Sequence, residues 1–341
     1  RRRIPDARLA SAQAQPSGVH LTFRTTATVI ELETLPTKRA YAGLPPLPDG
    51  VYDLVVDGRL VARTTVPGGN VDTVIDTVTQ EAELTEGPSG RARFEELSAG
   101  EKNVEIWLPH NEITELIALR TNAPVLPQPP RDRLWLHHGS SISHGSNATH
   151  PTGTWPAIAA AVGCVDLINL CFGGSALLDP FVARAIRDTP ADLISLKLGI
   201  NVVNADVMRL RAFTPAVHGF LDTIRDGHPR TPLLVISPIL CPIQEHTPGP
   251  VMPVPSADGL RFEATGDPAE VRAGKLTLTV IREELERIVA ERTAEDPNLH
   301  LLDGRALYGT EDYARLPLPD ELHPDGPTHT LIGTRFGELA F

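Results

Sequence analysis

The distribution of apolar and polar residues divides the chain into two parts. Between residues 19 and 116, apolar and β-branched residues alternate with polar ones, as in HLTFRTTATVIELETL and YDLVVDGRLVARTTV, and helical periodicity is almost absent. A period of two is typical of half-buried strands. Asp57 and Gly58 separate two apolar runs, which indicates a hairpin turn, and further strands are expected within 73–84, 92–97 and 104–108. The pattern predicts an all-β sandwich.

The aromatic residues of this first part indicate its role. Tyr52, Phe94 and Trp107 can all be assigned to a core, and no row of exposed aromatic residues suited to stacking on sugar rings is evident. We therefore expect the sandwich to brace its neighbour, with carbohydrate binding as the alternative.

A proline-rich stretch, APVLPQPP at 123–130, follows the sandwich. Because proline fixes φ and lacks an N–H, we expect a stiff linker that does not pair in a sheet. The predicted domains are a sandwich over 1–122, the linker over 123–130 and a second domain over 131–341.

After the linker, short apolar runs alternate with longer amphipathic ones. Strands are expected at 134–137, 165–170, 193–198, 233–237 and 299–302, and helices at 155–162, 180–187, 207–224 and 269–292. This alternation predicts βαβ units and an α/β fold, with a parallel sheet covered by helices on both faces. In such sheets, functional sites lie at the carboxyl ends of the strands.

Composition narrows the class of protein. The 341 residues are 41% hydrophobic and 22% charged, which fits a globular protein. A net charge of -12 argues against nucleic acid or an anionic membrane as partner. No apolar run reaches the roughly 18 residues needed to span a bilayer. The basic residues 1–3 are not followed by the apolar centre of a signal peptide, so a cytoplasmic location is expected, although the chain does not start with Met.

The cysteines Cys164, Cys171 and Cys241 include no CxxC pair. They favour buried free thiols in a reducing compartment and neither a disulfide framework nor a zinc site.

Polar residues gather where the predicted strands end. GSSI follows the first strand, NLCFGG ends the second, GIN follows the third, and DELHPD lies near the C-terminus. These segments supply Ser141, Gly174, Asn201, Asp320 and His323. A serine, a glycine backbone, an amide and an Asp–His pair are the groups that acyl transfer needs.

Each of these groups can be given a chemical role. A serine hydroxyl is a weak nucleophile at neutral pH, so His323 would take its proton, and Asp320 would accept the other imidazole N–H. Attack by Ser141 creates an oxyanion. Each hydrogen-bond donor to this oxyanion lowers the activation free energy by about 3–4 kcal/mol. The backbone N–H groups of Ser141 and Gly174 and the amide of Asn201 are the expected oxyanion hole.

GSSI, NLCFGG, GIN and DELH, in this order, resemble the four blocks of the SGNH (GDSL-type) hydrolase superfamily. The resemblance covers the second domain. It implies a flavodoxin-like α/β/α fold and hydrolysis or transfer of acyl esters by Ser141, Gly174, Asn201, Asp320 and His323. The first part, which ends in VEIWLP, resembles the jelly-roll module that precedes the catalytic unit in some bacterial carbohydrate esterases. The whole chain is similar to the GDSL-like acyltransferases of actinomycete tetracycline-type antibiotic biosynthesis, which move a salicylyl group from coenzyme A.

Two positions depart from the superfamily pattern. Ser140 replaces the Asp before the nucleophile, and Val202 replaces the Asp after the block-three Asn. Neither residue takes part in the proton relay described above. We expect them to change the local turn and the polarity of the pocket.

Several residues offer alternative interpretations. Ser140, Ser143 and Ser146 could each be the nucleophile, but register with the GDSI motif favours Ser141. Cys171 lacks a base of its own, and Asp325 is expected to be a loop or cap residue.

A metal site is not expected. His137 and His138 cannot both face one ion, because neighbouring side chains of a strand point to opposite faces. His144 and His150 could add ligands, but no carboxylate or thiol spacing supports zinc.

Three functions remain open. The first is an acyltransferase that carries an acyl group from acyl-coenzyme A, a co-substrate and not a bound cofactor, to a small-molecule alcohol. The second is a carbohydrate esterase-like enzyme with water as acceptor, and the third is a non-catalytic binding protein. No phosphate site for coenzyme A and no oligomeric state can be read from the sequence.

The Pro- and Gly-rich stretch 238–267 is expected to form a wall of the substrate pocket.

Overall fold

The computed structural model of the chain describes residues 6–76, 79–256 and 259–341. The basic residues 1–3, positions 77–78 of the predicted 73–84 strand and positions 257–258 of the 238–267 stretch lie outside the described residues.

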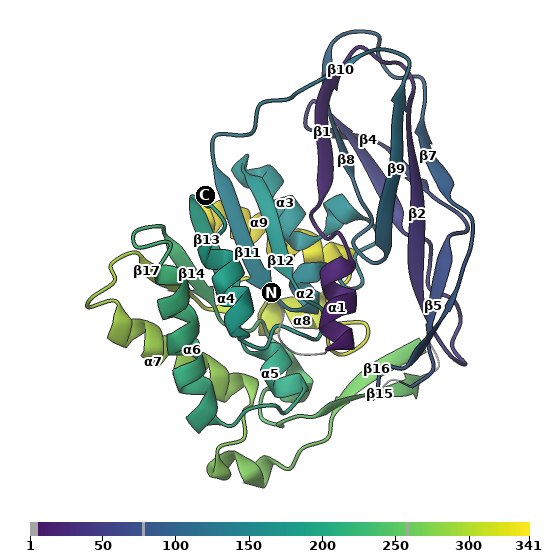
Figure 1. Cartoon of the computed structure of the whole chain (residues 1–341). Helices are drawn as coiled ribbons and strands as arrows, with labels where there is room; N and C mark the ends of the chain where they lie inside the picture. The colour runs from purple at the N-terminus through teal and green to yellow at the C-terminus, as the bar shows by residue number, and fades with distance from the viewer. Residues whose placement is uncertain (1–5, 77–78, 257–258) are drawn as a thin grey trace.

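A five-stranded parallel sheet forms the centre of the α/β part (Figure 1). Its strands are β11 (Leu134–Gly139), β12 (Asp166–Cys171), β13 (Leu193–Lys197), β14 (Leu233–Ile236) and β17 (Leu299–Leu302). They are ordered β12-β11-β13-β14-β17, the order of flavodoxin-like folds, in which the direction of winding changes at the first strand. All five predicted strands are confirmed, with ends that differ by at most two residues.

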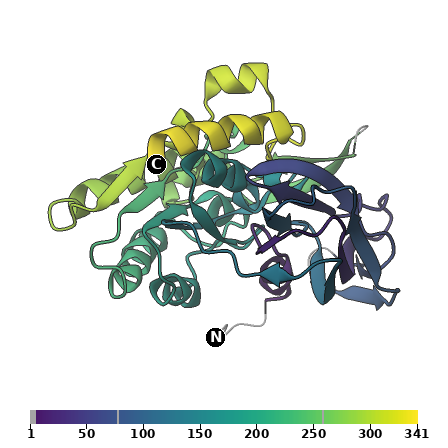
Figure 2. The ribbon, with the colours of Figure 1, turned by 90° about the horizontal axis from the view of Figure 1, so that it is seen from above.

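Helices cover both faces of this sheet. Trp135 of β11 packs against Trp155 of α3 (Trp155–Gly163) and Phe336 of α9 (Gly326–Ala340). On the other face, His138 lies beside Phe220 of α6 (Leu210–Arg225), which packs along α4 (Pro180–Arg187). Figure 2 shows α9 and the α4–α6 pair on opposite sides of the strands. The expected two-sided covering is confirmed.

One predicted helix is wrong. The segment 269–292 is divided into a 3₁₀ helix, η3 (Pro268–Ala273), and α7 (Leu278–Arg292). Gly274 has a φ of 91° and ends η3, and Thr277 caps α7 by accepting a hydrogen bond from the N–H of Val280. The helix expected at 207–224 begins three residues later, at Leu210. The shorter helices are α2 (Ser141–His144), η1 (Pro151–Gly153), α5 (Ile200–Asn204), η2 (Pro242–Gln244), η4 (Gly304–Ala306) and α8 (Thr310–Arg315).

Two sheets enclose the core of the β-rich part. One has the order β10-β1-β8-β3-β4, and the other has the order β6-β5-β2-β7 with β9 also paired to β2. The strands are β1 (His20–Thr25), β2 (Ile30–Tyr41), β3 (Val51–Val56), β4 (Arg59–Thr65), β5 (Asn70–Val74), β6 (Ala82–Thr85), β7 (Gly90–Phe94), β8 (Lys102–Trp107), β9 (Ile113–Thr121) and β10 (Val125–Leu126). Tyr52 and Phe94 are buried in this core, as expected.

The hairpin prediction is confirmed, and one strand prediction is wrong. β3 and β4 pair across Asp57 and Gly58, whose φ values of 47° and 76° are those of a tight hairpin turn. The segment 73–84 is not one strand, because β5 ends at Val74 and pairs antiparallel with β6.

The linker and the N-terminal segment differ from expectation. Val125 and Leu126 pair with Thr25 and Arg24 of β1, since these two residues of the proline-rich stretch keep their N–H groups. The unpredicted helix α1 (Ala7–Ala14) contacts both β9 of the sandwich and β12 of the α/β sheet. The helix α1 therefore touches both parts.

Among the described residues, no helix is long and apolar enough to cross a membrane.

Candidate active site

The turn after β11 places Ser141 at the start of a short helix. The backbone carbonyl of Ser140 accepts hydrogen bonds from the N–H groups of Ser143 and His144, which winds α2 immediately after the strand. Gly139 leaves room for this turn, because a Cβ there would lie 2.7 Å from Ser143 Oγ. The N–H of Ser141 belongs to the first turn of α2, where backbone donors have no partner within the helix. The Ser141 side chain is half-buried.

The structure brings Ser141, His323 and Asp320 into one line of hydrogen bonds. Ser141 Oγ lies 2.9 Å from His323 Nε2, and His323 Nδ1 lies 2.7 Å from Asp320 Oδ2. The other carboxylate oxygen, Asp320 Oδ1, accepts the N–H groups of Leu322 at 2.9 Å and of His323 at 2.6 Å. Asp320 therefore fixes both the histidine ring and the backbone that carries it.

The charge state of Asp320 suits this position. Burial raises its pKa, but the hydrogen bond and charge of His323 and the N–H groups of Leu322 and His323 outweigh burial, so the net pKa lies below the usual value. The carboxylate is thus ionised at neutral pH and can accept the Nδ1–H of His323.

Asn147 supports the same carboxylate and was missed by sequence reasoning. Its Nδ2 donates to Asp320 Oδ2 at 3.1 Å. Asn147 has a φ of 64°, a left-handed conformation that Asn adopts more readily than most residues. An Asn in a turn close after the nucleophile is the only signal that the sequence offers for this contact.

Gly174 and Asn201 lie at the carboxyl ends of β12 and β13, where they were expected. Gly174 has a φ of 68°, and a Cβ there would lie 3.1 Å from Arg8 Cδ of α1. Asn201 Oδ1 accepts the N–H of Ala176 at 3.1 Å, which fixes the orientation of its amide. Asn201 Nδ2 is buried and has no hydrogen-bond partner among the described residues. The amide therefore keeps one N–H donor group uncommitted.

The neighbouring Gly173 borders the nucleophile. A Cβ on Gly173 would lie 3.8 Å from Ser141 Cβ, an ordinary contact distance. The loop after β12 is thus placed beside Ser141 by its glycine backbone.

The stretch 238–267, expected to form a wall of the substrate pocket, contains a β-hairpin of β15 (Val251–Ser256) and β16 (Gly259–Ala264). The ring of Phe262 stands edge-on to the ring of His323, with centroids 5.4 Å apart. The N–H of Phe262 donates to the carbonyl of Asp320 at 3.0 Å. The hairpin therefore borders the histidine side of the site.

The alternative residues take other positions. Ser140 and Ser143 are buried, and their hydroxyl oxygens have no partner among the described residues. Cys171 is a buried free thiol, and burial raises its pKa, as expected for a packed thiol. Cys241 is also buried. Cys164 is exposed, contrary to expectation, because it caps the end of α3. Asp325 caps α9 by accepting the N–H of Thr328, as predicted.

The histidines that could have bound a metal are directed elsewhere. His137 bonds Ser195 Oγ at 2.7 Å on one face of the sheet, and His138 bonds the carbonyl of Leu170 at 2.6 Å. His144 faces two backbone carbonyls, and His150 bonds Asp53. Over the described ranges, no group of three or more His, Cys, Asp or Glu side chains could hold a metal ion.

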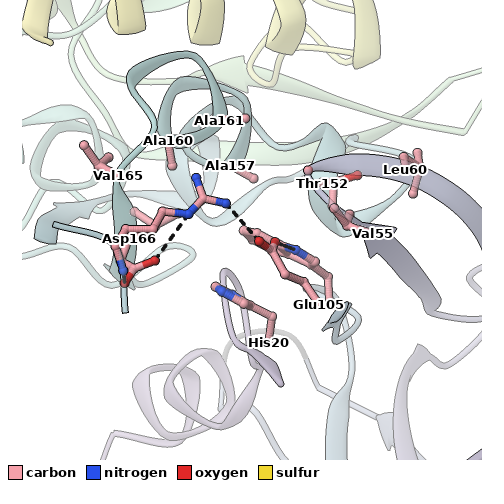
Figure 3. Close-up of a pocket in the computed structure, with 14 residues that line it drawn as sticks. His20, Val55, Leu60, Glu105, Thr152, Ala157, Ala160, Ala161, Val165 and Asp166 are labelled. Atoms are coloured by element: carbon pink, nitrogen blue, oxygen red, sulfur yellow. Dashed lines mark hydrogen bonds and ion pairs between the residues drawn. The ribbon is translucent and has the colours of Figure 1, made fainter. Parts of the chain in front are cut away.

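A separate cavity of about 200 Å³ lies between the sandwich and the α/β part (Figure 3). At the wall of this cavity, Arg131 forms ion pairs with Glu105 at 2.8 Å and with Asp166 at 3.5 Å. Asp166 begins β12, so this wall is at the amino end of the strand, opposite the end that leads to Gly174. None of the five predicted site residues lines the cavity.

A known protein family matches part of the chain. Residues 135–243, which carry Ser141, Gly174 and Asn201, match the GDSL-like lipase/acylhydrolase family. This match, together with the structural similarity described below, supports the resemblance of the α/β part to the SGNH (GDSL-type) hydrolases. No curated protein matches the chain.

Three solved structures are similar to the chain along almost its whole length. The salicylyl-acyltransferase SsfX3 from a tetracycline biosynthetic pathway is 29% identical, with a TM-score of 0.77 over 97% of this chain and 84% of that chain. A GDSL-like lipase from Bacteroides ovatus is 18% identical, with a TM-score of 0.68 over 97% and 86% of the two chains. A family two carbohydrate esterase from Clostridium thermocellum is 12% identical, with a TM-score of 0.63 over 95% and 91%. The two last likenesses concern the fold alone.

Proposed function

We propose that the protein transfers an acyl group, aromatic in the preferred case, from a coenzyme A thioester to a hydroxyl group of a small natural-product acceptor, through an acyl-serine. The observation that carries the chemistry is the line from Ser141 through His323 to Asp320, with contacts of 2.9 and 2.7 Å. The similarity to SsfX3 along almost the whole chain supports transfer as the outcome.

The first half of the reaction loads the serine. His323 Nε2 takes the proton of Ser141 Oγ as the oxygen attacks the thioester carbonyl. The oxyanion is received by the N–H groups of Ser141 and Gly174 and by Asn201 Nδ2, the amide group without a partner in the described chain. His323 then returns the proton to the departing thiolate, while Asp320 stabilises the imidazolium.

The second half releases the acyl group. An alcohol takes the place of the thiol, and His323 removes its proton as the alcohol oxygen attacks the acyl carbonyl. The ester bond to Ser141 Oγ then breaks, and His323 returns the proton to that serine oxygen. With water in place of the alcohol, the same residues give hydrolysis. An O-acyl esterase is therefore the second candidate, and the fold shared with carbohydrate esterases supports it. No permanently bound cofactor is needed, and acyl-coenzyme A as donor agrees with the cytoplasmic location expected from the sequence.

The sandwich, interpreted as a jelly-roll-like module over 1–122, braces the α/β part in this proposal. Trp107 and Val55 pack on Ala157 of α3. Asp53 Oδ2 accepts hydrogen bonds from His150 Nδ1 at 2.7 Å and from Thr152 Oγ1 at 2.6 Å. Burial opposes the charge on Asp53, but these bonds outweigh it and lower its pKa. A buried ionised contact supports a fixed arrangement of the two parts.

The test is intact-mass analysis with peptide mapping after addition of benzoyl- or acetyl-thioesters. An adduct on the Ser141 peptide that is absent from Ser141→Ala is expected. Its decay with added alcohols, compared with water alone, measures transfer against hydrolysis. A thioester that turns over equally fast in both proteins would refute the mechanism.

A further inference from the structure

The β15–β16 hairpin has two chemically different faces. Directly paired residues of an antiparallel hairpin share a face, and alternate residues along a strand share it too. Phe262 pairs with Pro253, and Leu260 pairs with Pro255, so these four uncharged residues form one face. Arg261 and Glu263 belong to the other face, with Val254 and Met252 as their partners.

The uncharged face is the one that meets the proposed active site. Phe262 stands edge-on to His323 at 5.4 Å, so the face begins at the histidine ring. Leu260 lies two residues further along the same strand and is 37% exposed. An apolar surface therefore extends outward from His323 to solvent.

The position beside His323 decides which substrate the face meets. In the second half of the proposed reaction, the attacking hydroxyl must reach hydrogen-bond distance of His323 Nε2. The carbonyl oxygen of the acyl group instead lies toward Gly174 and Asn201. Groups packed around the histidine ring therefore border the acceptor.

We propose that Pro253, Pro255, Leu260 and Phe262 form an acceptor subsite for an apolar, ring-bearing alcohol. The inference rests on the proposed function and adds the chemical class of the acceptor. These four side chains offer no hydrogen-bond donor or acceptor, so the hydroxyl groups of a sugar would lose water there without compensation. A flat apolar ring would bury area against them and displace the water that competes for the acyl-serine.

The test measures how the acyl-enzyme divides between water and two primary alcohols, 2-phenylethanol and ethylene glycol. Phe262→Ala is expected to lower ester formation with 2-phenylethanol about tenfold relative to hydrolysis. Ester formation with ethylene glycol is expected to stay within about twofold, since a small diol buries little area. Phe262→Leu should recover part of the loss, and Met252→Ala, on the opposite face, is the matched control and should behave as the wild type.

Two results of the partition experiment would overturn the subsite. Equal losses for both alcohols would assign Phe262 to positioning His323, and unchanged ratios would place the acceptor elsewhere. Binding is measured separately by titrating 2-phenylethanol into Ser141→Ala and Ser141→Ala/Phe262→Ala and following NMR shifts. Saturable binding to the first and at least fivefold weaker binding to the second are expected, and equal binding would refute the subsite.

The same experiment separates this inference from the proposed function. If thioesters fail to acylate Ser141 but p-nitrophenyl acetate succeeds, the proposed donor is wrong and the alcohol ratios still test the subsite. If neither donor acylates, the binding comparison decides alone.

Discussion

Asn147 and His323 share one oxygen of Asp320, although Asn147 follows the nucleophile and Asp320 lies 173 residues later. The hydrogen bond ties the turn that carries Ser141 to the loop that carries its base. Asn147→Gly keeps a residue that tolerates the φ of 64° and removes only the amide. Because a hydrogen bond to a charged group contributes about 1.5–3 kcal/mol and this contact is exposed, so that the lower end of the range applies, we expect kcat/KM to fall about tenfold. An unchanged kcat/KM in steady-state assays with a thioester would show that the contact is unimportant.

Substitution of the nucleophile Ser141 or of the carboxylate Asp320 should lower the reaction rate without unfolding the protein. Ser141→Ala is expected to lower kcat by at least about 10⁴-fold, and Asp320→Asn by about 10⁴-fold, since the amide favours the wrong histidine tautomer. The melting temperature of Ser141→Ala should stay near that of the wild type. Substantial thioester turnover by a folded Ser141→Ala protein would exclude the acyl-serine.

Asn201 should contribute through its donor group. Asn201→Asp keeps an oxygen that can accept the N–H of Ala176 and loses the Nδ2–H donors. We expect kcat to fall about 10²–10³-fold, the usual effect of losing one oxyanion donor, while KM changes little. The measurement is steady-state kinetics, with circular dichroism as the check on folding. A loss confined to KM would assign Asn201 to substrate binding instead.

The two adjacent glycines should respond differently to alanine. At Gly174, the φ of 68° and the 3.1 Å approach to Arg8 make any Cβ strained, so Gly174→Ala should cost about 1–2 kcal/mol of unfolding free energy. At Gly173, a Cβ would make an ordinary 3.8 Å contact with Ser141. Gly173→Ala should therefore fold normally and slow acylation by benzoyl donors more than by acetyl donors. Urea titration and the two acylation rates test this, and equal instability of both variants would contradict it.

Glu112 in the sandwich should make stability depend on pH. Burial raises its pKa to about 7, and the hydrogen bond from the N–H of Gly50 offsets only part of that effect. The folded state therefore binds this proton more tightly than the unfolded state, so the stabilisation is complete below the unfolded pKa of about 4.3 and is lost as the pH rises through 7. Glu112→Gln should raise the melting temperature at pH 8 and change it less at pH 5. A variant with equal shifts at both values would show that Glu112 is not the titrating group.

The central sheet could be predicted because each of its strands is a separate apolar run. Where the pattern crosses a break without interruption, prediction failed: the apolar spacing of 269–292 continues through Gly274, whose φ of 91° is invisible in the periodicity. The helix α1 was missed because only Leu9 and Ala12 of its eight residues are buried, which is too weak a pattern to detect.

The polar residues at the strand ends could be predicted to meet because parallel strands bring their carboxyl ends to one edge. Asn147 and Phe262 could not, since each reaches the site from a turn or hairpin. Their partners lie far away in the sequence, and no local period encodes such a contact.

The position of α1 limits where the protein can be shortened without losing part of the α/β structure. It packs on β12, yet the whole sandwich lies between it and β11 in the sequence. The sandwich is thus tied to the α/β part before β1, where α1 contacts both parts, and again after β10, where the chain enters β11. A protein shortened to begin after the 123–130 stretch would lose a helix whose Arg8 lies against Gly174. Removal of the sandwich would instead require joining the end of α1 to β11, and a circular permutant opened within the sandwich would keep both connections.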